Sequence, residues 1–130
     1  MSARTAAFHV DLLGVLFGLW GLLMIMIGAS TLALAVSAAA LLRTHGGAGS
    51  AQFAAGLTAA TFVVLALFAL IWGFLHLIVG RRLRQHSQWS RLAALALGSA
   101  DLALLPHGTA LGGYSLWTLL GDDAKRLFEA

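Results

Sequence analysis

Two ionisable side chains, His76 and Asp101, lie inside long apolar stretches of the sequence. A histidine within a membrane segment can bind a haem or a chlorophyll-type metal through a ring nitrogen, or can relay protons. The structural alternative is a histidine that hydrogen-bonds to neighbouring backbone or reaches the membrane interface. A haem held by two histidines would need a second one at the same depth, and we expect His107 to lie too far from His76.

Asp101 is the only carboxylate well inside an apolar stretch. An acid there is costly and suggests a proton or ion path, for which only His107 would offer a titratable partner at matching depth. Asp101 also lies shortly before Pro106, so its carboxylate can instead bind free backbone donors at a turn. Pro106 itself suits the first turn of a helix, where its missing N–H costs nothing. Both interpretations stay open.

A third candidate is the aromatic pair Tyr114 and Trp117, three residues apart in the last apolar stretch. A quinone or a lipid could lie against such a pair, and the alternative is aromatic packing within the protein core. Together with His76, this pair forms a cofactor hypothesis in which the cofactor is a haem, a pigment or a quinone. The residues do not say which cofactor that would be.

The rest of the sequence carries no recognisable catalytic constellation. The absence of cysteine excludes disulfides, thiolate catalysis and Cys-ligated zinc or iron–sulfur clusters. No Walker A loop, dinucleotide glycine fingerprint, H-E-x-x-H or G-x-S-x-G motif occurs. The net charge is +3, and the basic residues lie mostly in one loop, which favours a membrane surface over nucleic acid. We therefore predict a protein that is not an enzyme and has no nucleic-acid partner.

The elements that must position these residues are membrane helices. The 130 residues are 60% hydrophobic and 10% charged, whereas soluble domains are about a quarter charged. A spanning helix needs roughly 20 apolar residues, and residues 12–42 and 53–80 both exceed that length. Residues 89–105 and 107–121 are shorter and fit with snorkelling ends or a thin bilayer. The alternative for them is one long broken helix or a re-entrant hairpin.

Loop charges favour four spans in a single domain. With a cytoplasmic N-terminus, four spans place seven basic residues inside and only Arg43 outside, whereas three spans give five against three. A cleavable signal peptide is rejected because the first apolar stretch is about twice a normal h-region. We predict an all-α integral membrane four-helix bundle, N-in and C-in, in a bacterial inner membrane. The predicted membrane-surface residues, acting as topology signals or contacts for anionic headgroups, are Arg81, Arg82, Arg84 and Arg91.

Glycines in the apolar stretches indicate where helices approach closely, because lipid gives no hydrophobic drive for association. Gly14, Gly21 and Gly28 follow a seven-residue spacing, which Gly73 and Gly80 repeat in the second stretch. These spacings indicate contacts within a left-handed bundle. The predicted helix-packing residues are Gly14, Gly18, Gly21, Gly28, Gly73, Gly108 and Gly112.

Segments near the membrane surface give further expectations. His9, His45 and His86 read as solvated loop residues. Residues 122–128 read as an interfacial helix end, with Leu127 and Phe128 dipping into lipid. The outer ends of the first two stretches are alanine-rich, and an apolar end that projects from the bilayer would need a partner surface.

The stretch from Pro106 to Leu120 reads PHGTALGGYSLWTLL. It resembles the last helix of a group of small, uncharacterised four-span bacterial inner-membrane proteins, whose motif is P-x-G-T-A-L-G-x-Y-x-L-W-x-L-L. The group also tends to carry a W-x-R pattern after a basic loop, which Trp89 and Arg91 match. The sequence departs from the group at His107 and Gly113, where its members usually carry apolar side chains, and at Asp101, where Asn is expected. The resemblance implies topology and a bacterial origin, and no activity.

The leading functional hypothesis is a small structural or accessory subunit of a homo-oligomer or a larger membrane complex. Its partners would be the lipid bilayer, other copies of the chain or other membrane subunits. One alternative is the cofactor-bearing protein that uses His76, Tyr114 and Trp117. The other is a small channel or transporter that uses Asp101, which would need surrounding protomers to complete a pore.

Overall fold

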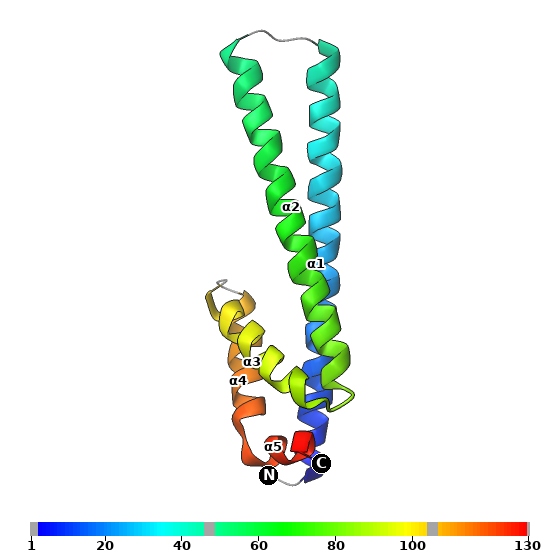
Figure 1. The fold of residues 1–130 in the computed structure, drawn as a ribbon, viewed down its shortest axis with the longest axis vertical. Coiled ribbons are helices and arrows are strands. Elements are labelled where there is room, and N and C mark those ends of the chain that lie inside the picture. The colour runs from blue at the N-terminus through cyan, green and yellow to red at the C-terminus, as the bar shows by residue number, and fades with distance from the viewer. Residues whose placement is uncertain (1–2, 46–48, 104–106, 130) are drawn as a thin grey trace. The chain divides into compact units, whose positions relative to one another are not determined.

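The computed structural model describes residues 3–45, 49–103 and 107–129, and it is all-helical over these residues (Figure 1). Pro106 lies outside the described residues, as do the side chains of His45 and His107. The five helices are α1 (Ala3–His45), α2 (Ser50–Leu83), α3 (Gln88–Ala103), α4 (His107–Leu120) and α5 (Asp122–Glu129). The all-α prediction is confirmed.

The helices divide into two compact units. Unit 1 comprises residues 1–21 and 75–130, and unit 2 comprises residues 22–74. Unit 1 therefore contains the first part of α1, the last part of α2, and all of α3, α4 and α5. Unit 2 is a hairpin formed by the remainder of α1 and α2.

Two of the described helices are long and apolar enough to cross a membrane, namely Arg4–Thr44 and Ser50–Leu83. The 16 residues of α3 and the 14 residues of α4 would rise about 24 and about 21 Å. Both lengths are below the roughly 30 Å of a hydrocarbon core. The structure thus supports two membrane-spanning helices by length and composition, and the spans at 89–105 and 107–121 stay predictions.

The first helix begins at Ala3, well before the apolar stretch that starts at residue 12. Ala6, Val10, Leu13 and Phe17 are all fully buried in unit 1. Their spacing of four, three and four residues is that of one helical face. The polar residues between them interrupt the hydropathy of this segment but not its helical periodicity, so α1 extends to the N-terminal side.

The turn between α2 and α3 stops the second helix sharply. His86 adopts a left-handed conformation with φ of 52°. Its N–H donates to the carbonyl of Leu83 at 3.0 Å, and the N–H of Ser87 donates to the carbonyl of Arg82 at 3.4 Å. This is the Schellman pattern that satisfies the last carbonyls of a helix. The turn sends the chain directly into α3.

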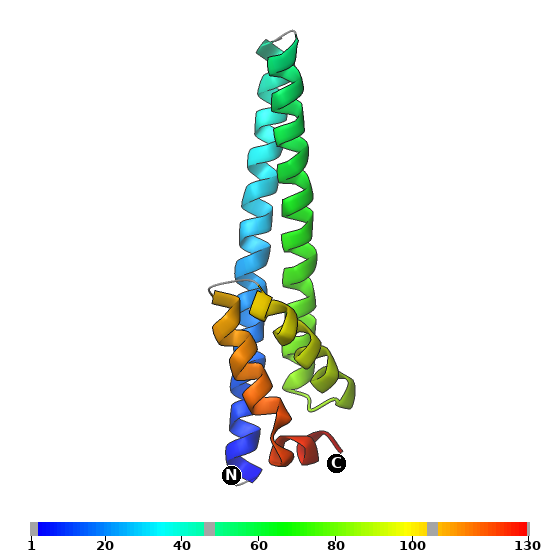
Figure 2. The ribbon, with the colours of Figure 1, turned by 90° about the vertical axis from the view of Figure 1, so that its left-hand side faces the viewer.

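Helices α3 and α4 form a tight hairpin, and α5 follows it (Figure 2). The short α5 has acidic residues in its first turn and Arg126 in its last, which complements the helix dipole. Ala124 and Phe128, four residues apart, are buried in the core of unit 1, and Leu127 packs against that core. The expectation that Phe128 dips into lipid is wrong, because Phe128 is buried on protein, whereas Leu127 is only half-buried.

Candidate functional site

A buried pair of ionisable side chains joins α2 to α3 in unit 1. Nε2 of His76 and Oδ2 of Asp101 are hydrogen-bonded at 2.8 Å, and both side chains have no exposed surface. The sequence predicted both residues as candidates, but it paired Asp101 with His107 or with backbone donors. The structure brings Asp101 to His76 instead.

The helix geometry explains why these two residues were not paired from the sequence. From His76 to the end of α2 at Leu83 is about 10 Å along the helix, whereas from Gln88 at the start of α3 to Asp101 is about 20 Å. In a simple antiparallel hairpin the two side chains would therefore lie at different depths. In unit 1, α3 is tilted relative to the last part of α2, and this tilt lets Asp101 reach His76. No local sequence pattern reports such a tilt.

A phenyl ring covers the histidine of the pair. Phe17 of α1 stacks on His76 with ring centroids 5.1 Å apart and an interplanar angle of 26°, and Phe17 is itself fully buried. Three helices thus converge on the pair: α1 through the ring, α2 through the imidazole and α3 through the carboxylate. Water is excluded, so each member of the pair depends on its neighbours for hydrogen bonding.

The pair can hold a proton between two groups without leaving an isolated charge in the core. A buried carboxylate or imidazolium without a partner is strongly unfavourable, and the direct hydrogen bond removes that penalty. The same bond engages Nε2 of His76, so a metal-bearing cofactor at that nitrogen would have to displace Asp101. The arrangement suits either a polar clamp between helices or a proton site.

The aromatic pair Tyr114 and Trp117 lies elsewhere in unit 1. It contacts His9, which the sequence analysis had assigned to a solvated loop. Nδ1 of His9 and the hydroxyl of Tyr114 are hydrogen-bonded at 2.8 Å. The His9 ring also meets Trp117 edge-on, with centroids 5.4 Å apart. His9 therefore lies in α1 and links it to α4, which corrects its assignment to a solvated loop. Tyr114 and Trp117 stack with centroids 6.0 Å apart, and the Trp117 side chain remains exposed.

The predicted packing glycines fall at three kinds of position. At Gly14, Gly28 and Gly112, an added Cβ would meet the backbone of a neighbouring helix, at Gly80, Ala66 and Gly98 in that order. Beside Gly18 there is open space, while Gly21, Gly73 and Gly108 are buried. The α3 contact of Gly112, at Gly98, was not predicted. The sequence feature that could have indicated this contact is the pair of small residues Ala94 and Gly98, which are four residues apart and both buried.

The predicted membrane-surface arginines also differ from one another. Arg81, Arg82 and Arg84 are exposed around the end of α2. Arg91 is half-buried, and its Nε–H donates to the carbonyl of Leu119 at 3.1 Å. That carbonyl belongs to the last turn of α4, where the helix leaves its own acceptors unpaired. Arg91 therefore acts as a side-chain cap between α3 and α4.

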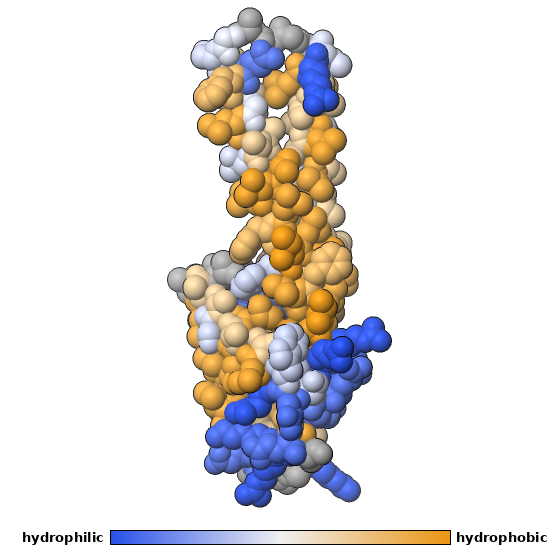
Figure 3. Space-filling model, viewed as in Figure 1, coloured by the Kyte–Doolittle hydropathy of each residue, from blue (hydrophilic) through white to orange (hydrophobic). Residues whose placement is uncertain are grey.

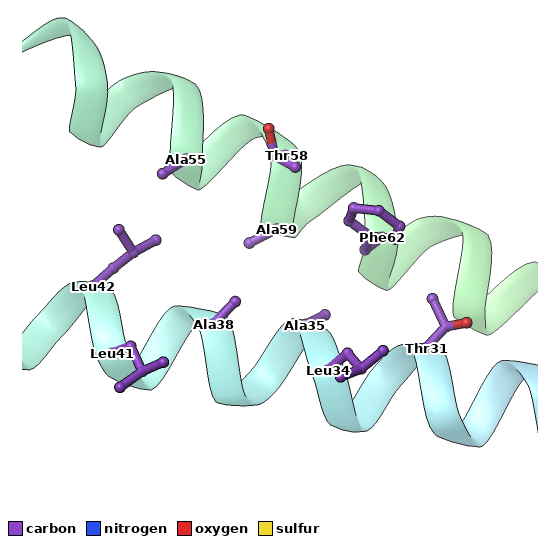
Figure 4. A pocket seen from close by; sticks show the side chains of 10 residues that line it. All are labelled: Thr31, Leu34, Ala35, Ala38, Leu41, Leu42, Ala55, Thr58, Ala59 and Phe62. Carbon is purple, nitrogen blue, oxygen red and sulfur yellow. The ribbon is translucent and has the colours of Figure 1, made fainter.

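Unit 2 contains an apolar cleft of about 790 Å³ between its two helices (Figure 4). Small and aliphatic side chains make up most of its wall, with one phenyl ring. The lining residues are Thr31, Leu34, Ala35, Ala38, Leu41, Leu42, Ala55, Thr58, Ala59 and Phe62.

No group of three or more His, Cys, Asp or Glu residues that could hold a metal ion occurs within the described parts of the chain. Comparison of the chain with protein-family models, with curated proteins and with solved structures found no match. The resemblance of residues 106–120 to small four-span membrane proteins accordingly stays a prediction.

Proposed function

We propose that the chain is a non-enzymatic integral membrane protein that serves as a small structural or accessory subunit of a homo-oligomer or a larger membrane complex. In this proposal the chain crosses a bacterial inner membrane four times, with both termini in the cytoplasm. The observation that carries the proposal is an exposed stripe of small residues on α1. The stripe consists of Ala29, Ala33, Ser37 and Ala40.

The stripe lies apart from the face of α1 that packs on α2. Gly28 and Ala35, which are buried, form the face toward α2, whereas all four stripe residues are exposed. The hydroxyl of Ser37 donates to the carbonyl of Ala33 at 2.8 Å, so it adds no unpaired donor to the surface. In lipid, a surface of small side chains gains energy by close packing against another helix. The stripe therefore fits a second helix.

Unit 1 is consistent with the same role, because a core of its own holds its helices together. The His76–Asp101 bond, the Phe17 ring and the Gly98–Gly112 contact hold helices together inside one core.

Cysteine cross-linking in native membranes tests the proposal, because the chain has no cysteine of its own. Ser37→Cys on the stripe is expected to form disulfide-linked dimers of the chain, or adducts with another subunit, on mild oxidation. Leu34→Cys is the matched control, since Leu34 lies at similar depth, is 72% exposed and is not part of the stripe. Equal cross-linking of both variants, or none with Ser37→Cys, would contradict the assignment of this surface.

The four-span topology is tested by a single cysteine at the end of α3. Ala103 is exposed and precedes the α3–α4 connection, which four spans place outside the cell. An impermeant maleimide should therefore label Ala103→Cys in intact cells, and it should also label Gly49→Cys between the first two helices. Labelling of Ala103→Cys only after the cells are opened would mean that α3 and α4 do not cross the membrane.

A second candidate function is a small channel or transporter in which Asp101 carries protons or ions. The buried His76–Asp101 pair favours it, because ionisable residues inside membrane proteins often mark translocation paths. Proton flux into liposomes, followed with a pH-sensitive dye, should then fall in Asp101→Asn relative to the native chain. Unchanged flux removes this candidate. The cofactor alternative makes a separate prediction, a visible absorption band that disappears in His76→Ala.

A further inference from the structure

A patch of positive charge surrounds the end of α2, where Arg81, Arg82 and Arg84 are all exposed. Among residues 3–45, 49–103 and 107–129, none forms an ion pair with any of the three. Acidic residues are also absent from the neighbouring sequence, since positions 12–100 contain no Asp or Glu. This arginine patch therefore presents three guanidinium groups without an acidic partner in the described parts of the chain.

The stem of Arg84 is seated against α1. An added Cβ at Gly14 would lie 2.7 Å from Cγ of Arg84 and 2.8 Å from the carbonyl oxygen of Gly80. The bare glycine backbone thus leaves the space in which the aliphatic part of Arg84 lies, while the side chain as a whole stays exposed. A stem held in this way loses less conformational freedom when its guanidinium group binds an anion. Arg84 is therefore positioned before any anion binds.

The patch lies where a candidate membrane helix ends. Residues Ser50–Leu83 are long and apolar enough to cross a bilayer, and the patch occupies the last turn of this helix and the residue after it. The turn that follows is tight, so Trp89 at the start of α3 stays close to the patch, and its side chain is 60% exposed. Exposed tryptophan favours the headgroup level of a bilayer. The arginines and the indole together indicate a surface that lies among headgroups.

We propose that the arginine patch binds the phosphate groups of anionic phospholipids in the leaflet where α2 ends. Planar guanidinium groups donate paired hydrogen bonds that match phosphate oxygens. Arg81 and Arg82 are consecutive on α2, so they leave its axis about 100° apart and do not converge on one point. A set of cations spread around a helix end suits a surface of headgroups rather than one soluble phosphate ion. A topology signal needs the same charges, but it predicts no lipid preference in the folded chain.

This inference rests on α2 lying in a membrane, and on neither the subunit role nor the passage of α3 and α4 across the bilayer. The test uses the purified full chain in phosphatidylcholine vesicles that contain traces of spin-labelled phosphatidylglycerol or spin-labelled phosphatidylcholine. Electron paramagnetic resonance measures how much of each labelled lipid the chain immobilises. The native chain should prefer phosphatidylglycerol. Arg81→Gln/Arg82→Gln/Arg84→Gln should lower this preference at least about fivefold, the effect of a single basic residue near an anionic lipid.

Arg43→Gln is the matched control for Arg84→Gln, because Arg43 is exposed near the far end of α1 and each substitution removes one charge. Arg43→Gln should leave the lipid preference as it is in the native chain, whereas Arg84→Gln should lower it. Variants are compared only at native helical content by circular dichroism. Arg81→Gln/Arg82→Gln replaces the triple variant if that variant loses helix, since it leaves the Arg84 stem on Gly14 in place.

An unchanged preference in the triple variant would overturn the proposal and leave the arginines as a topology signal. Equal losses in Arg43→Gln and Arg84→Gln would also overturn it, because the net charge and not the patch would then set the preference. Inorganic phosphate is the third probe, and it should displace phosphatidylglycerol no more than sodium chloride of equal ionic strength does. Stronger displacement by phosphate would mean that the patch binds a soluble anion and that the lipid assignment is wrong.

Discussion

The two units of the molecule bury different kinds of residue. Unit 1 buries large side chains, among them Leu13, Phe17 and Leu119, together with the His76–Asp101 pair. In unit 2, every buried residue within the described ranges 22–45 and 49–74 is a glycine or an alanine. Figure 3 shows apolar surface over most of the unit 2 hairpin, with hydrophilic surface near the end where its helices are joined.

The difference shows how each unit is stabilised. Unit 1 has a core of its own, because packing of large side chains contributes most of the free energy that opposes unfolding. Unit 2 buries little, and an isolated two-helix hairpin that exposes its large apolar side chains depends on lipid or a partner helix for stability. Unit 1 is therefore packed by its own side chains, whereas the large apolar side chains of unit 2 remain at its surface.

The largest effect is expected from breaking the buried pair of unit 1. Asp101→Ala removes the buried carboxylate that Nε2 of His76 binds and should lower the free energy of unfolding by about 3–5 kcal/mol. Asp101→Asn keeps an oxygen that can accept from His76 and should cost much less. Thermal unfolding in detergent, followed by circular dichroism, measures both. Equal stability of Asp101→Ala and the native chain would show that the pair does not hold the core.

Truncation of leucine to alanine compares the two units directly. Leu13 is fully buried in unit 1, whereas Leu34 in unit 2 is 72% exposed. Leu13→Ala should destabilise the chain by about 2–5 kcal/mol, because it removes buried methyl groups and leaves a cavity. Leu34→Ala should change stability little in the same detergent. A cost for Leu34→Ala as large as that for Leu13→Ala would mean that unit 2 is not the lipid-facing or partner-facing unit.

A smaller difference in stability is expected between alanine substitutions at two adjacent glycines of α4. An added Cβ at Gly112 would meet the backbone of Gly98, whereas none of the described atoms lies within 4 Å of one at Gly113. Gly112→Ala should therefore cost about 1–3 kcal/mol by forcing α3 and α4 apart. Gly113→Ala should stabilise by about 0.5–1 kcal/mol, because alanine favours the helix. The same unfolding assay reads both, and a harmless Gly112→Ala would rule out a tight α3–α4 contact.

The smallest effect concerns α5. The hydrogen bond from Nζ of Lys125 to Oδ1 of Asp122, 3.0 Å long, lowers the pKa of Asp122 below its ordinary value of 3.8. Because the pKa of Asp122 is lower in the folded state, its carboxylate stabilises the fold at pH values above the ordinary pKa. This stability is lost as the pH falls through the lowered pKa. Because both groups are exposed, the change in stability should be slight. Carboxyl NMR of Asp122 should show its pKa rising in Lys125→Met, and no rise would mean that the bond does not persist.

Hydropathy and charge were enough to predict the all-α class and the two long helices, because both depend on local composition. The helix α1 begins earlier than the apolar stretch from which its span was predicted, since Arg4 and Asp11 lower hydropathy without breaking the helix. The His76–Asp101 pair and the unit 2 cleft depend on how helices incline and diverge. Tertiary packing sets those angles, and residue spacing along one chain does not report them.

The central claim is that the exposed hairpin of unit 2 is covered by other protein in the membrane. Native mass spectrometry of the chain, released gently from its own membrane, tests this claim most directly. The account predicts a mass of several copies, or of one copy with added chains. A single chain, bare or carrying only phospholipid, would contradict the account.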